Sequence, residues 1–103
     1  MKYQLVLQWP SSSSISEYDR LISLEETIRD GLGEFGIVDG HDIGSGEMNI
    51  FIHTDEPARA FERAKLLLDP RKDLDEMKAG YRDFDQDEYI AIFPQGIEHF
   101  SVI

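Results

Sequence analysis

Residues 44–54 read Gly44-Ser45-Gly46-Glu47-Met48-Asn49-Ile50-Phe51-Ile52-His53-Thr54. From residue 47 onward, apolar side chains alternate with polar or aromatic ones, which is the pattern of a strand with one buried face. The glycines before it suit the positive φ angles of a tight turn, and another strand-like run, residues 35–43, precedes them. This stretch therefore predicts a β-hairpin with strands at 35–43 and 47–54.

Two elements are expected before this hairpin. The side chains from Tyr3 to Trp9 alternate in the same way and predict a first strand. Ser14 and Glu17 form a capping box, so a helix should begin there, and the apolar residues that follow recur at helical spacing. We expect the helix to end at Gly31.

Two more elements are expected after it. Residues 54–57, Thr-Asp-Glu-Pro, predict a helix start, because capping oxygens come before a proline in the first turn. Residues 78–84 and 88–93 predict a second hairpin. Residues 94–103 form a tail whose structure the pattern does not define.

The resulting order is strand, helix, strand, strand, helix, strand, with one added C-terminal strand. It predicts a single α+β domain over residues 1–103, a two-layer sandwich of ferredoxin-like type (βαββαβ), in which two helices cover one face of an antiparallel sheet. One parity of the strand residues should pack against the helices, namely Tyr3, Leu5, Leu7, Met48, Ile50 and Ile52.

The other parity defines a sheet face that we expect to be open to solvent. It carries the candidate ligand-binding residues Gln8, Asp39, His41, Asn49, Phe51 and His53. If Ser45 is the centre of the turn, the two histidines lie roughly 13 Å apart along the strands, too far for one metal ion. Asp39 and His53 are diagonal neighbours within hydrogen-bonding reach. We expect no metal or cofactor here. The alternative to a ligand-binding site is a polar sheet face that is simply solvated.

The composition limits the classes of partner. The 21 acidic side chains outnumber the 10 lysines and arginines, and the formal net charge is −11. Nucleic acids and anionic membranes attract basic surfaces, so neither is an expected partner, whereas a basic protein is. The chain has no cysteine, which excludes disulfides and thiolate chemistry. It shows neither a signal-peptide pattern nor a long apolar run, and we expect a cytoplasmic protein.

The hairpin at residues 44–54 resembles that of small bacterial proteins for which no activity is established. The likeness continues through Tyr81-Arg82 and Phe93-Pro94. It implies a ferredoxin-like fold and no particular site. Two enzyme groups of similar fold offer weaker analogies. Acylphosphatases use an arginine in the loop after the first strand, but residues 10–14 contain no arginine. Haem-degrading monooxygenases use an asparagine, a tryptophan and a histidine, and this chain has Asn49, Trp9 and His53. However, the alternation places Trp9 on the face that packs against the helices, away from the other two.

Three functions follow as hypotheses. The leading one is a non-catalytic acidic protein that binds a basic protein partner, for example a toxin-neutralising immunity protein. The second is a small-molecule site on the open face, in which Asp39 would orient His53 as a general acid or base. The third is a structural domain that forms a homodimer through the same face.

Overall fold

The computed structural model describes residues 1–103. Its elements in chain order are β1 (Tyr3–Pro10), α1 (Ile15–Gly31), the 3₁₀ turn η1 (Gly33–Phe35), β2 (Ile37–Gly44), β3 (Glu47–Thr54), α2 (Pro57–Leu67), β4 (Lys78–Asp83) and β5 (Ile90–Phe93). Each predicted strand and helix is present. The prediction that a strand begins at Phe35 is wrong, because the Phe35 amide bonds to the Leu32 carbonyl (3.3 Å) and closes the 3₁₀ turn.

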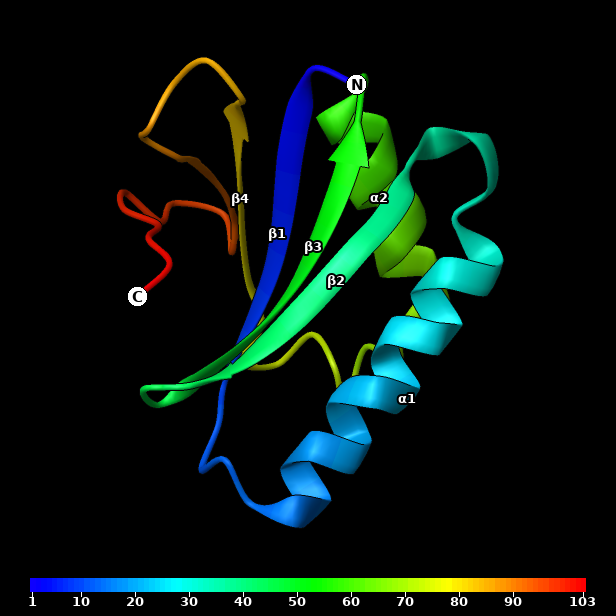
Figure 1. Ribbon diagram of the computed structural model, residues 1–103, viewed down its shortest axis with the longest axis vertical. Coiled ribbons are helices and arrows are strands. Elements are labelled where there is room, and N and C mark those ends of the chain that lie inside the picture. Colours follow the sequence, from blue (N-terminus) through cyan, green and yellow to red (C-terminus); the bar gives the residue numbers. More distant parts are fainter.

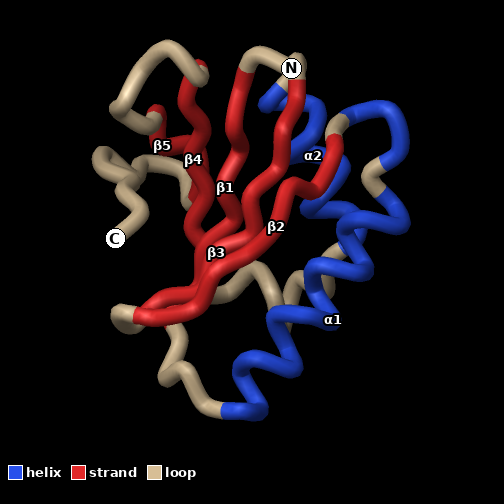
Figure 2. The backbone as a smooth tube through the Cα atoms, viewed as in Figure 1, coloured by secondary structure: helices blue, strands red, loops and turns tan.

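The five strands form one antiparallel sheet in the order β2-β3-β1-β4-β5. Both helices lie on one side of this sheet, and the C-terminal segment lies on the other (Figures 1 and 2). The protein is therefore of the α+β class, with two helices on an antiparallel sheet. Neither helix is long and apolar enough to cross a membrane.

The main core lies between the sheet and the helices. The predicted inward parity is confirmed for the strand residues Leu5, Leu7, Met48, Ile50 and Ile52, all fully buried. The helices add buried apolar side chains, namely Leu21, Leu24, Ile28, Ala60, Phe61 and Ala64. Trp9 completes the core at one end, where its indole Nε1 donates to the Asp73 carbonyl (2.6 Å) and so fixes the loop before β4.

Ser14 caps α1 as predicted, whereas α2 begins at Pro57 as expected but its N-cap residue, Glu56, makes no side-chain cap hydrogen bond. Ser14 Oγ accepts a hydrogen bond from the Glu17 amide (3.2 Å) at the beginning of α1. Thr54 Oγ1 accepts from the Glu56 amide (2.9 Å) before α2 and donates to the Phe35 carbonyl (2.6 Å). The Ser14 bond satisfies a backbone donor that a helix start leaves without a partner. The Thr54 hydroxyl instead orders the turn before α2 and joins η1 to the end of β3.

Candidate functional site

The sheet face away from the helices, here called the outer face, carries most of the predicted site residues. The register pairs Gln8 with Asn49, Val6 with Phe51 and Gln4 with His53. Gln8, Asn49, Phe51 and His53 therefore lie on the same face, because side chains two residues apart in a strand point to the same side. The structure places these four side chains on one face, as the alternation predicted, and joins Gln8 to Asn49 by a hydrogen bond.

His41 is not on this face, and its predicted position is wrong. The turn consists of Ser45 and Gly46, whose φ angles of 53° and 84° are those of a two-residue type I′ connection. His41 consequently pairs with Ile50 and points to the helix side of the sheet, as Ile50 does. A bulge at Asp39 then shifts the register by one residue, so that Ile37 pairs with His53 as predicted. The His41 ring points toward α1, where its Nδ1 lies 2.8 Å from a carboxylate oxygen of the buried Glu25.

The predicted contact between Asp39 and His53 is confirmed. His53 Nε2 lies 3.3 Å from Asp39 Oδ2. On its other side the His53 ring meets Phe84 edge to face, with centroids 4.9 Å apart. Phe84 and the strand neighbour of His53, Ile37, are both exposed. Ile37, His53 and Phe84 thus form a small apolar and aromatic patch, here called the Phe84 patch, beside an exposed carboxylate.

Gln8 and Asn49 are buried rather than open to solvent. Gln8 Nε2 lies 3.0 Å from Asn49 Oδ1 and 3.1 Å from Glu47 Oε2. Asn49 Nδ2 donates to Asp42 Oδ1 (2.9 Å) and to Glu47 Oε2 (3.0 Å). The two amides thereby hold two carboxylates together at the hairpin end of the sheet. The amide groups of Gln8 and Asn49 are thus engaged within the chain, whereas Asp42 remains exposed.

The C-terminal residues 94–103 cover this half of the outer face, so the expectation that the whole face is open is wrong. Phe100 is buried and sits over Gly80, where a side chain would leave no room for its ring. The Ser101 carbonyl accepts from Gln8 Nε2 (2.9 Å), and the Ile103 amide donates to Glu47 Oε2 (3.2 Å). Val6, fully buried on this face, is separate from the main core, and so is Phe100.

An acidic pocket lies where this segment meets the loop between β4 and β5. It is a concavity of about 450 Å³ lined by Asp87, Glu88, Tyr89, Glu98, His99, Phe100, Ser101 and Val102. Three of its side chains are carboxylates. Tyr89 and Phe100 contact each other edge to face (centroids 5.3 Å apart) and provide aromatic surface beside them. Carboxylates next to aromatic rings are the groups that bind lysine and arginine side chains.

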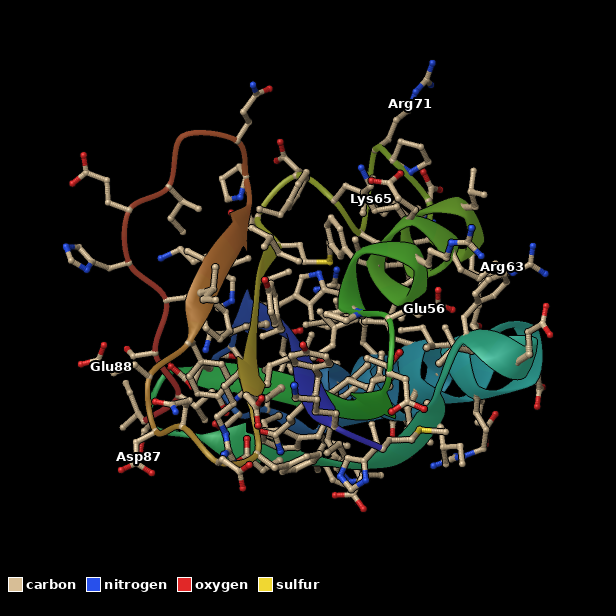
Figure 3. All side chains as sticks on the ribbon, turned by 90° about the horizontal axis from the view of Figure 1, so that it is seen from above. Glu56, Arg63, Lys65, Arg71, Asp87 and Glu88 are labelled. Atoms are coloured by element: carbon tan, nitrogen blue, oxygen red, sulfur yellow. The ribbon has the colours of Figure 1, made fainter.

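Charge is strongly segregated along the chain. Residues 30–58 hold seven acidic side chains and residues 83–103 hold five, and neither segment has a lysine or arginine. The rest of the chain holds nine acidic and ten basic side chains, so it is close to neutral. Figure 3 shows Arg63, Lys65 and Arg71 on the α2 side of the molecule and Asp87 and Glu88 on the opposite side. The negative charge therefore belongs to residues 30–58, of which Asp39, Asp42 and Glu47 lie in the hairpin of β2 and β3, and to the C-terminal part.

Three cations border the outer face: Arg82 and Lys2 have partners within the chain, whereas Lys78, which pairs with Gln8, is exposed. Arg82 donates from Nε to Gln4 Oε1 (3.1 Å) and from Nη1 to the Gln86 carbonyl (3.1 Å). Lys2 Nζ lies 3.5 Å from Asp83 Oδ2. Its pKa is raised above 10.5, chiefly by the charge of the neighbouring Tyr3 phenolate and then by Asp83. Lys2 thus stays charged at neutral pH, and its charge is directed to Asp83.

The sequence-based prediction did not include the acidic pocket, although the distribution of charged residues along the chain indicates an acidic region. The lysine- and arginine-free segments can be found by counting, and they mark the two parts of the chain that supply the acidic side. The burial of Phe100 had no such signal, because residues 94–103 have no strand or helix periodicity. Comparison of the chain with protein-family models, curated protein sequences and solved structures found no match.

Proposed function

We propose that the chain is a non-catalytic binding protein that engages a basic protein partner through its outer face. The observation that carries the proposal is the acidic pocket, a concavity with three carboxylates and two aromatic rings that suits a lysine or arginine side chain. A toxin-neutralising protein of the immunity type would use such a surface to cover a basic region of its target.

The surroundings of the pocket support this partner chemistry. The two segments without lysine or arginine concentrate carboxylates in the C-terminal part and the β2–β3 hairpin, and such a charge would increase the rate at which a basic protein associates. The Phe84 patch adds exposed apolar surface on the same side of the sheet. Protein interfaces commonly combine an apolar or aromatic centre with a polar rim. The outer face therefore offers both steering charge and apolar contact area.

Selection from a library of random 12-residue displayed peptides tests the proposal. We expect the enriched peptides to be rich in lysine and arginine, and we expect the double variant D87N/E88Q to bind them about three- to tenfold more weakly. The matched control is D19N/E26Q, which removes one Asp and one Glu from the exposed surface of α1. Equal loss in both variants, or enrichment of peptides without positive charge, would contradict a specific acidic site.

The two other hypotheses make different demands on the structure. A ligand site across all six predicted residues would need His41 on the outer face, whereas a smaller one would be left with Asp39, Phe51 and His53. The analogy with monooxygenases would also need Trp9 close to His53, but Trp9 is buried in the main core. A homodimer through the outer face would have to form on top of the C-terminal segment, and sedimentation at high concentration distinguishes it from a monomer.

The fold itself also supports a class. We infer that it is ferredoxin-like: β3 lies between β1 and β2 and is antiparallel to both, and β4 flanks β1 on the other side. In this interpretation β5 is an addition at the edge next to β4. This class hosts many unrelated functions, so the proposed function depends on the site and not on the fold.

A further inference from the structure

The helix layer leaves part of the sheet uncovered on its inner side. Two adjacent helices are each about 10 Å wide and cover about four strands at 4.8 Å spacing. This sheet has five strands, and α2 packs mainly on β1 and against α1, meeting β5 at its end through Phe61 and Phe93. Ile90 of β5, which pairs with Tyr81, is consequently 56% exposed although it has inward parity. The uncovered strip forms one wall of a groove.

The groove runs between α2 and the strands β4 and β5 and has a volume of about 690 Å³. Ligand-binding cavities in proteins are commonly about 300–1,000 Å³. Its apolar lining consists mainly of the aromatic side chains of Phe61, Tyr81 and Phe93 together with Ile92. The rings of Phe61 and Phe93 are in contact, with centroids 5.4 Å apart. Their planes are tilted by 52° and Phe61 is buried, so the accessible aromatic surface comes from Tyr81 and Phe93, which suits an aromatic ligand.

One charged side chain on the rim is drawn over this aromatic surface. Lys65 Nζ lies 5.0 Å from the ring centroid of Phe61 and 5.7 Å from that of Phe93, and the side chain is only 29% exposed (Figure 3). Its ion-pair partner Glu62 is 69% exposed and is held at 3.2 Å by this one contact. The second rim pair, Arg59 with Glu56, points into solvent, with side chains 69% and 56% exposed.

We propose that this groove binds a planar aromatic monoanion, such as an aromatic carboxylate. The ring system would pack on the partly exposed rings of Tyr81 and Phe93 above the buried Phe61, and the carboxylate would accept a hydrogen bond from Lys65 Nζ while Glu62 turns out to solvent. The charge of Lys65 favours an anionic ligand over a neutral one, because its ammonium group can donate a strong charge-assisted hydrogen bond next to an apolar surface. This site lies on the opposite side of the sheet from the acidic pocket, so it is independent of the proposed function.

Two probes of nearly equal shape test the inference, namely 2-naphthoate and the neutral 2-naphthalenemethanol. In ¹H–¹⁵N NMR titrations we expect both to shift amides of α2 and β5, with 2-naphthoate binding at least about fivefold more tightly. The substitution Lys65→Met should remove that advantage and leave the alcohol's affinity unchanged. The control Lys72→Met removes an exposed lysine in the loop after α2 and should change neither affinity.

Several results would overturn the inference. These are shifts that map to another surface, equal affinity of the two probes, or equal effects of Lys65→Met and Lys72→Met, which would reflect net charge alone. A variant that fills the groove, Ala58→Phe, provides a second test, because Ala58 lines it and is exposed. It should weaken both probes together. If both bind this variant as they bind the parent protein, the groove is not their site.

Discussion

Substitution of Gly80 by alanine should detach the C-terminal segment from the outer face. The new methyl group would lie 2.6 Å from Cγ and Cδ1 of the Phe100 ring, about 1 Å closer than carbon atoms normally approach. Gly80 lies in β4 between β1 and β5, so the backbone cannot retreat, and the ring must move. Loss of the burial of a phenylalanine side chain costs about 2 kcal/mol, which corresponds to a decrease in Tm of about 10 °C.

Urea unfolding gives the change in stability, and amide hydrogen exchange gives its location. We expect fast exchange of the Ile103 amide, which donates to Glu47, while the amides of β1 stay protected. The matched control is Gly40→Ala on the same face, where a methyl group would meet no atom within 4 Å. In a Phe100→Ala background, Gly80→Ala should cost almost nothing. Unchanged Tm and unchanged protection of Ile103 in the single variant Gly80→Ala would refute the argument.

Three further changes test the elements around the sites. Gly46→Ala should cost about 1–2 kcal/mol in urea unfolding, because Gly46 has a φ of 84° in the turn between β2 and β3; no loss would mean that the turn adopts another form. Trp9→Phe should cost about 1–3 kcal/mol by leaving the partly buried Asp73 carbonyl without its donor, and a near-neutral result would mean that water replaces the indole. Lys2→Met should lower stability slightly at neutral pH, because it removes the ion pair with Asp83 (3.5 Å), and the pKa of Lys2 is raised in the folded state, first by the charge of Tyr3 and then by Asp83. That contribution should disappear as the pH rises through the raised pKa, and a difference that persists at higher pH would contradict this assignment.

The sequence predicted the elements well where a local pattern determines them. Alternation in residues 47–54 identified β3 and its buried face, and the hydroxyl of Ser14 marked the start of α1. The sequence could not predict the bulge at Asp39. An extra residue in a strand is visible only as a break in the alternation of polar and apolar residues, and in this strand polar residues occur on both faces. This single residue moved His41 to the other face of the sheet.

The candidate site was predicted only in part for a similar reason. The contact of Asp39 with His53 followed from strand spacing and is present. The burial of Gln8 and Asn49 depends on Phe100, which lies far along the chain in a segment without periodicity, and on the absence of a side chain at Gly80. Packing between residues far apart in the chain depends on the three-dimensional arrangement of the strands, so a local sequence pattern cannot predict it.

The most direct test of the central claim is where a basic peptide binds. An NMR titration with a lysine-rich peptide from the library selection should shift amides in residues 83–103 and in the hairpin of β2 and β3. The same titration with D87N/E88Q should give clearly weaker binding, whereas D19N/E26Q should behave as the parent protein does. Shifts that centre on α1 or α2, or that weaken equally in both variants, would contradict the acidic outer face as the binding surface.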